Sequence, residues 1–152
     1  MFSKSCEYGI RAVVFIAIAS CKGRKVGFKE IAREIASPEA FTGKILQTLV
    51  KQKIIMSFKG PSGGFFMPEE FLSRIKLADI VSAMDGDAVF KSCPLGLNMC
   101  SEDMPCPVHD KFTCVRSELE QMLHAVSIAD LTKNINTQHA FLKRVVITNI
   151  ID

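Results

Sequence analysis

The stretch FKEIAREIASPEAFTGKILQTLV, residues 28–50, precedes a short extended segment, a glycine-rich turn and a second extended segment. Apolar side chains recur at helical spacing within residues 28–35, and the opposite side of that helix is charged. Ser37 and Pro38 are typical of a helix start, because a hydroxyl caps the first turn and proline tolerates the first helical position. The amphipathic pattern resumes over residues 38–52. Two short helices joined by a tight turn predict a helix-turn-helix.

The second helix of this motif has an apolar inner side and a polar outer side. We expect the outer side to enter the major groove of DNA, where uncharged polar and basic groups read bases and phosphates. The predicted DNA contacts of the motif are Thr42, Lys44, Gln47 and Thr48, with Lys29 from the preceding helix. The pattern alone is weak, because many small helical hairpins share it.

The segments that follow predict a β-hairpin wing. Residues 53–58 are rich in β-branched and apolar side chains, and residues 64–67 form a second extended run. The tip between them, Lys59-Gly60-Pro61-Ser62-Gly63-Gly64, is basic and lacks bulky side chains. We assign Lys59, Ser62, Gly63 and Gly64 to DNA, since a bare backbone approaches phosphates or the minor groove closely. The alternative is an ordinary hairpin loop.

Charge is divided unevenly along the 152 residues. Residues 1–76 carry 13 Lys and Arg against 6 Asp and Glu, whereas residues 77–152 carry 6 against 10. The first half is therefore +7 and the second −4, which gives the net +3. A basic half favours a polyanion partner such as nucleic acid, although a solvated lysine-rich surface gives the same count.

An apolar run at residues 12–19 admits two interpretations. Basic residues precede it, and Ile18-Ala19-Ser20-Cys21 is similar to the cleavage site of an exported lipoprotein. The run is short, however, and Glu7 lies in what would be a cationic leader. Its apolar spacing fits a buried helix face, so we expect a first helix over residues 5–20 of a cytoplasmic protein. No segment is long enough to span a bilayer, and no membrane partner is expected.

Six cysteines indicate a reducing compartment and metal or redox chemistry. Three of them form the pattern Cys93-x6-Cys100-x5-Cys106-x2-His109, in a segment interrupted by prolines and glycines. Such a segment folds as a bent loop that can surround one centre. Zinc in a closed structural site and a metal-free thiol switch both fit these residues.

The residues after the loop predict a dimerisation helix. Phe112, Val115, Leu119, Met122 and Val126 are spaced 3, 4, 3 and 4 residues apart, which is an a/d seam of just over two heptads. A helix packed only within its own core would show the same spacing.

These patterns predict a mainly α protein with a small β-hairpin wing, a winged helix-turn-helix followed by a long C-terminal helix. We expect further helices at residues 75–85 and after a Ser127-x-x-Asp130 capping box. The predicted divisions are a DNA-binding domain (1–88), a Cys/His cluster-binding loop (89–111), a dimerisation helix with its following turn (112–134) and a C-terminal tail (135–152).

Four segments together resemble the IscR/NsrR family of bacterial winged-helix transcription regulators. They are Tyr8-Gly9-Ile10-Arg11-Ala12, Gly60-Pro61-Ser62-Gly63-Gly64, the Cys93/Cys100/Cys106 loop and Ser127-Ile128-Ala129-Asp130-Leu131. The similarity extends to about residue 134. The chain departs from the family pattern in a first cysteine gap of six residues, and in Gly43, where relatives can carry a larger polar side chain.

The resemblance implies a homodimer that binds palindromic promoter DNA, with repression as the default outcome and no enzymatic activity. Several family members hold an iron–sulfur cluster that sets DNA affinity, and others lack one. A cluster here would use Cys93, Cys100 and Cys106, with His109 as fourth ligand and Glu7 as the alternative. A [2Fe–2S] cluster is favoured over [4Fe–4S], with zinc or no cofactor as further alternatives. The rival function is a small Cys/His metalloprotein, either structural zinc or an electron carrier.

Overall fold

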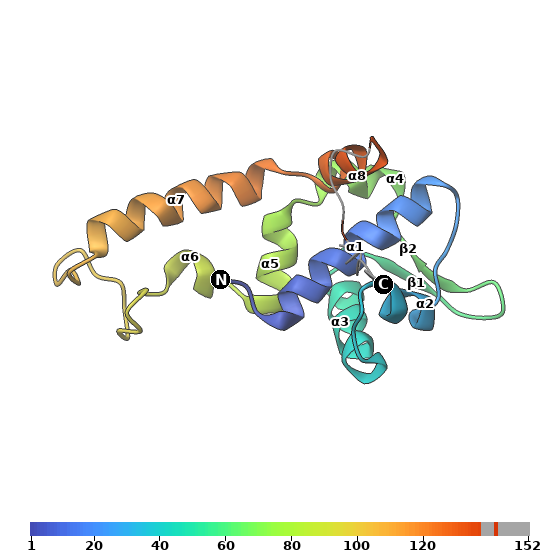
Figure 1. Cartoon of the computed structure of the whole chain (residues 1–152), viewed down its shortest axis with the longest axis horizontal. Helices are drawn as coiled ribbons and strands as arrows, with labels where there is room; N and C mark the ends of the chain where they lie inside the picture. The colour runs from blue at the N-terminus through green and yellow to red at the C-terminus, as the bar shows by residue number, and fades with distance from the viewer. Residues whose placement is uncertain (138–141, 143–152) are drawn as a thin grey trace, which may run out of the picture.

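The computed structural model describes residues 1–137 and 142 of the chain. In these residues a helical head carries a two-stranded hairpin, and one long helix extends away from the head (Figure 1). The elements are α1 (Lys4–Cys21), α2 (Phe28–Glu34), α3 (Glu39–Lys51), β1 (Met56–Phe58), β2 (Gly64–Phe66), α4 (Glu69–Arg74), α5 (Leu77–Asp85), α6 (Ala88–Lys91), α7 (His109–Ala125) and α8 (Ile128–Asn136). The expected fold class, mainly α with a β-hairpin wing, is confirmed.

Helix α1 runs through the centre of the head. Ser3 caps it, because the Ser3 Oγ accepts the Cys6 amide at 3.1 Å. The apolar run at residues 12–19 supplies the core-facing side of this helix, which packs against α3, α5 and α8. This run is therefore part of the hydrophobic core, as its spacing predicted. Among the described residues, no helix is both long and apolar enough to cross a bilayer.

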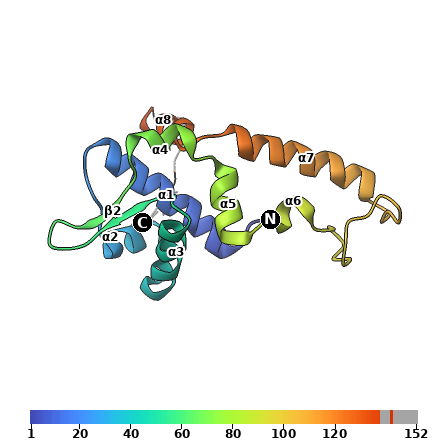
Figure 2. The same ribbon diagram turned by 180° about the vertical axis from the view of Figure 1, so that it is seen from behind.

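The predicted helix-turn-helix is formed by α2 and α3, which pack against each other. Ala36, in the turn, adopts a left-handed conformation with φ of 52°, and the Ser37 amide donates to the Ala32 carbonyl at 3.0 Å. Pro38 occupies the cap position, and α3 begins one residue later than predicted. Figure 2 shows α2 beside α3, on the side of the head away from α7.

One predicted contact on α3 is wrong. Thr42 was assigned to the outer side of the helix, but its side chain is fully buried. The residue is in line with Ile45, Leu46 and Leu49 at helical spacing, so it belongs to the inner stripe. Its methyl group suits the core, and its hydroxyl is satisfied by donating to the Pro38 carbonyl at 3.0 Å.

The wing is an antiparallel pair in which Met56 faces Phe66 and Phe58 faces Gly64. An isolated bridge between Val26 and Phe65 widens it, with backbone hydrogen bonds of 3.0 and 2.8 Å. Because the backbone of Val26 lies so close, a Cβ on Gly64 would stand 2.8 Å from the Val26 carbonyl oxygen. Gly64 also has a φ of +136°, so this position requires glycine for packing and for conformation.

Gly63 likewise serves the hairpin itself. A Cβ at this position would overlap the Phe58 carbonyl oxygen, and the Gly63 amide donates to the Gly60 carbonyl at 2.9 Å. That amide is therefore engaged inside the turn. The assignment of Gly63 to DNA stays a prediction.

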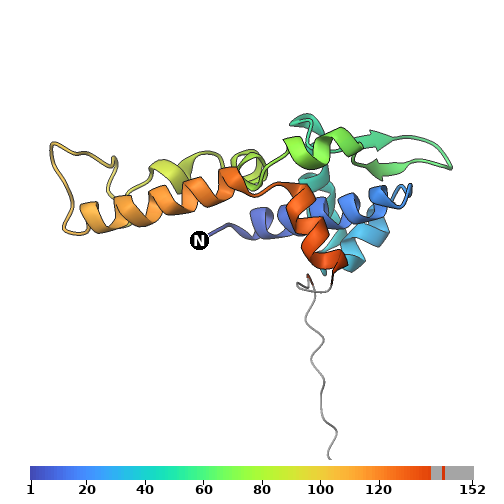
Figure 3. The ribbon, with the colours of Figure 1, turned by 90° about the horizontal axis from the view of Figure 1, so that it is seen from above.

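Helix α7 leaves the head and carries the cysteine loop at its far end (Figure 3). Its other end is fixed to the head by two backbone hydrogen bonds, from Leu77 N–H to the Val126 carbonyl at 3.0 Å and from Ile128 N–H to the Ile75 carbonyl at 3.1 Å.

The predicted capping box of α8 is present, since Ser127 and Asp130 exchange side chain–backbone hydrogen bonds. Two short helices, α4 and α6, were not predicted. Residues 135–136 of the predicted tail belong to α8, whereas 138–141 and 143–152 lie outside the described residues.

Candidate metal centre and DNA interface

Most of the side chains assigned to DNA are accessible. Lys29 on α2, Lys44 and Gln47 on α3, and Lys59 and Ser62 on the wing tip are exposed. Thr48 is half-buried, and its hydroxyl donates to the Lys44 carbonyl at 3.1 Å. Lys44 of α3 and Lys59 of the wing therefore present ammonium groups that make no ion pair with the described residues.

The sequence analysis missed Lys25 on the wing. Its ammonium stands 4.5 Å from the centre of the Phe58 ring, which is a cation–π contact between the α1–α2 turn and β1. Its neighbour Arg24 instead pairs with Glu30 at 2.8 Å. The basic character of residues 22–25 was the available signal, but the sequence did not indicate which cation lies on the wing.

The cysteine loop, residues 92–108, lies at the far end of α7 from the head (Figures 1 and 3). Cys93 is buried, Cys100 and Cys106 are half-buried, and all three are free thiols. His109 is the first residue of α7 rather than a loop residue, and its amide donates to the Cys106 carbonyl at 2.9 Å. The fold thus holds the histidine on a regular helix while the thiols lie on the irregular chain before it.

The loop brings its four predicted ligands together as two pairs. In the first pair, the Cys100 Sγ lies 3.5 Å from the His109 Nδ1. In the second, Cys106 lies near enough to Cys93 to be one of the groups that lower the pKa of its thiol. Within the part of the chain that the structure describes, no three Cys, His, Asp or Glu side chains lie close enough together to bind one metal ion. Each pair offers two donors to one metal atom, which is the number that each iron of a [2Fe–2S] cluster takes from the protein.

Backbone amides stabilise the ionised form of Cys93. The amide of Leu95 is the main cause, and that of Leu97 adds to it, so the pKa of Cys93 lies below its ordinary value despite burial. Cys106 and the charge of Arg116 act in the same direction. A thiolate is the form that ligates metals, so this environment suits a metal ligand.

Arg116 is a residue of this site that the sequence analysis did not single out. Its guanidinium donates from one nitrogen to the Ser92 carbonyl at 3.1 Å and from another to the Cys100 Sγ at 3.4 Å. These contacts join α7 to points 24 and 16 residues earlier in the chain. No local sequence pattern indicates a contact of that span.

A hollow of about 390 Å³ opens beside His109. Glu102, Pro105, Asp110 and Thr113 complete its lining, so it lies between the loop and the first two turns of α7. Small solutes can therefore approach the histidine end of the donor set from solvent.

The alternative ligand Glu7 lies on the first turn of α1. Its carboxylate pairs with the Lys4 ammonium at 2.7 Å, which lowers the pKa of Glu7. In the described residues no contact joins this carboxylate to the cysteine loop. The structure therefore brings His109, and not Glu7, to the thiols of the same chain.

The predicted seam of α7 is open to solvent in the single chain. Val115 is 60% exposed, and Phe112 and Met122 are each 45% exposed. Leu119 and Val126 are half-buried, because α7 packs on α5 and α6 through Leu119 and Leu123. Apolar side chains in a row, uncovered on one side of a helix, need a partner surface.

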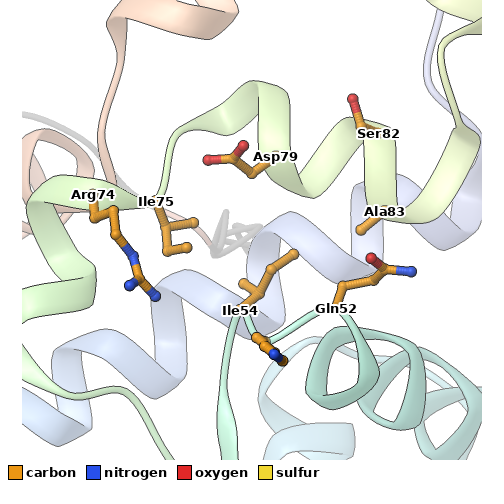
Figure 4. A pocket seen from close by; sticks show the side chains of 8 residues that line it. Gln52, Ile54, Arg74, Ile75, Asp79, Ser82 and Ala83 are labelled. Carbon is orange, nitrogen blue, oxygen red and sulfur yellow. The ribbon is translucent and has the colours of Figure 1, made fainter.

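A second cavity, of about 470 Å³, lies between the end of α3 and helix α5 (Figure 4). Its lining contains no cysteine or histidine, and its one carboxylate, Asp79, already accepts the Lys76 amide at 2.7 Å. The remaining lining residues are Gln52, Lys53, Ile54, Arg74, Ile75, Ser82 and Ala83. This cavity is not a candidate metal centre.

A helix-turn-helix with an adjoining hairpin wing and accessible cations defines a DNA-binding regulator of the winged helix-turn-helix class. The model of the Rrf2 family, described as an iron-dependent transcriptional regulator, matches residues 2–134. The chain belongs to the Rrf2 family of transcription regulators. The expected resemblance is confirmed, and membership of a family of regulators assigns the protein to transcription control rather than catalysis.

Individual relatives agree with this assignment. A protein of Aquifex aeolicus (strain VF5), described as an HTH-type transcriptional regulator, is 32% identical over 143 residues, which cover 93% of this chain and 96% of the relative. CymR (YrzC), the global cysteine regulator of B. subtilis, matches with a TM-score of 0.71 at 19% identity, covering 88% of this chain and 96% of that one. IscR of T. potens matches with a TM-score of 0.70 at 20% identity, covering 93% and 92%. The two structural matches concern the fold.

Proposed function

We propose that the protein is a cytoplasmic, homodimeric repressor whose affinity for promoter DNA is set by an iron–sulfur cluster. The ligands are Cys93, Cys100, Cys106 and His109, and [2Fe–2S] is favoured over [4Fe–4S]. The observation that carries the proposal is the contact of the Cys100 Sγ with the His109 Nδ1 at 3.5 Å, beside the same loop that holds the free thiols of Cys93 and Cys106. The family description as iron-dependent agrees with an iron-containing group.

The donor set suits a sensor. When bound, the cluster supplies iron that oxidants and nitric oxide can attack. Three thiolates with one imidazole leave one weaker ligand, and the hollow of about 390 Å³ gives small solutes access to the His109 side. His109 begins α7, so a change in its ligation acts directly on the helix that carries the apolar seam.

The head contacts DNA through α3 and the wing. Lys44, Gln47 and Thr48 enter the major groove, while Lys59 and Ser62 follow the minor groove and the phosphates. Pairing of two copies along the α7 seam sets two α3 helices about 34 Å apart, one turn of DNA. Cluster gain or loss shifts the relative placement of the two heads, which needs only about 1–3 kcal/mol of coupling free energy.

Anaerobic purification tests the cluster. We expect a coloured protein that contains iron and sulfide, and Cys100→Ser and His109→Ala are expected to lose or alter the visible absorption. Cys114→Ser is the matched control, because Cys114 is exposed and does not belong to either donor pair. A colourless protein with stoichiometric zinc would instead establish a structural metal site.

The contact between Cys93 and Cys106 favours one second candidate, a metal-free thiol switch. Two neighbouring thiols can form a disulfide, with two electrons and two protons passing to an oxidant such as a peroxide. Mass spectrometry after peroxide treatment distinguishes this candidate: a Cys93–Cys106 disulfide that changes DNA affinity in metal-free protein supports it.

A further inference from the structure

Arg116 occupies a distinctive place on α7. It is half-buried, and none of the ion pairs found within residues 1–137 includes it. Its partners are instead the Ser92 carbonyl at 3.1 Å and the Cys100 Sγ at 3.4 Å. Ser92 caps α6 at the entrance of the loop, and Cys100 lies in the middle of it. One side chain therefore holds two separate parts of the loop against the helix.

Arg116 and His109 act on the same sulfur from one side of α7. They are seven residues apart, which is close to two helical turns, so both project from the same face. Cys100 Sγ lies 3.5 Å from the His109 Nδ1 and 3.4 Å from an Arg116 nitrogen. A guanidinium can serve two acceptors at once because its donors form a planar fork, which an ammonium group lacks.

We propose that Arg116 is a positioning residue that closes the loop onto α7 and places a positive charge at the Cys100 sulfur. In the metal-free protein it fixes the segment from Ser92 to Cys100. In the cluster-bound protein its hydrogen bond to a ligand sulfur stabilises the extra electron of the reduced form. The second statement depends on the proposed function, whereas the first does not.

Hydrogen–deuterium exchange of the metal-free full chain tests the closure of the loop. The Gly96 amide donates to the Cys93 carbonyl at 3.0 Å, so this segment contains a protected amide. Arg116→Gln is expected to speed exchange there about tenfold, as losing one or two modest hydrogen bonds would. Unchanged exchange would overturn the proposal.

Two further variants keep this test decisive. Lys111→Gln removes the one lysine of α7, which is exposed, and is expected to exchange as wild type. Arg116→Lys keeps the charge but replaces the planar fork by a single nitrogen on a shorter side chain, so it should lose part of the protection even if Arg116→Gln fails to fold. Equal loss in Lys111→Gln would also overturn the proposal, because a general effect of charge would then explain the result.

Redox titration of the cluster-bound protein tests the second statement. If the hydrogen bond favours the reduced form tenfold, Arg116→Gln lowers the midpoint potential by about 59 mV for one electron. Arg116→Lys is expected to fall between Arg116→Gln and wild type, and an unshifted potential in both variants would overturn this statement. A colourless wild-type protein would overturn the proposed cluster, and the exchange experiment would still decide the closure of the loop.

Discussion

The ring of Tyr8 meets the ring of Phe41 edge-on, with centroids 5.7 Å apart and planes at 82°. The Arg11 guanidinium stands 4.6 Å from the Tyr8 ring centre on the same helix. One residue along, Gly9 lets α1 approach α5, since a Cβ there would lie 3.0 Å from the Met84 Cγ. The beginning of α1 thus contacts both α5 and α3, the helix that we propose to face DNA.

The Tyr8–Phe41 contact predicts a measurable loss of stability. Tyr8→Leu should lower the free energy of unfolding by about 1 kcal/mol, because the edge-to-face contact of the two rings is lost. Tyr8→Phe retains the ring and is expected to stay close to wild type. Denaturant unfolding measures both, and equal stability of Tyr8→Leu and Tyr8→Phe would contradict the role of the ring.

The head is expected to bind DNA through phosphate contacts from α3 and the wing. Lys44→Ala and Lys59→Ala should each weaken binding to duplexes of any sequence, and each should reduce the slope of log affinity against log salt by about 1. Lys91→Ala is the control, because Lys91 lies on α6 and pairs only weakly with Asp87 at the surface. Fluorescence anisotropy over a salt series gives the slopes, and wild-type slopes in both head variants would exclude this interface.

Gly43 lies inside α3, where glycine is unfavourable. A Cβ at this position would meet only Phe28 Cε2, at 3.6 Å, which is an ordinary contact. Gly43→Ala should therefore raise the free energy of unfolding by about 1 kcal/mol. Gly64→Ala should do the opposite, because of its φ and its contact with the backbone of Val26. A destabilised Gly43→Ala would show that α3 packs more tightly than its geometry indicates.

The α7 seam is expected to join two subunits. Val115→Asp and Met122→Asp should convert the dimer to a monomer, because each places a charge at the centre of an apolar interface. Both side chains are exposed in the single chain, so the helical circular dichroism should be preserved. Sedimentation at equal concentration measures the change, with the exposed, off-seam Ser117→Asp as control. Dimers that persist in both variants would place the interface elsewhere.

The capping box of α8 predicts a pH dependence. Hydrogen bonds from the Ser127 side chain and backbone lower the pKa of Asp130 below its ordinary value. The folded state therefore favours the ionised carboxylate, and this stabilisation is present at neutral pH and lost as the pH falls through the Asp range. Asp130→Ala should be less stable than wild type at pH 7, and the two proteins should converge below about pH 4. A difference that persists unchanged in acid would exclude the charge as its cause.

Periodicity predicted the head well because its helices are amphipathic and their inner sides are buried. The same rule, applied strictly, would have placed Thr42 inside, since it is in line with Ile45 and Leu49. Its polar side chain suggested the opposite, and only the hydroxyl bond to Pro38 shows how the core accommodates it. Helix α4 was not predicted because six residues with a mixed pattern are too short to show a period.

The candidate metal centre was predictable by residue type but not by arrangement. Cysteine spacing identified the candidate ligands, whereas the approach of Cys106 to Cys93 depends on how an irregular loop returns on itself. The role of Arg116 depends on the same path, since its partners lie 16 and 24 residues earlier in the chain. Contacts of that kind have no local signature in a single sequence.

Helix α7 has 17 residues, about 26 Å of rigid rod at 1.5 Å per residue. One end starts at His109, and the other is bonded through Val126 and Ile128 to the junction of α4 and α5. Because the head end of this rod is anchored, a change in its direction where the thiols lie would be passed as a rotation to the junction of α4 and α5. In the function that we propose, this geometry would carry a chemical event at the loop to the head without unfolding any element in between.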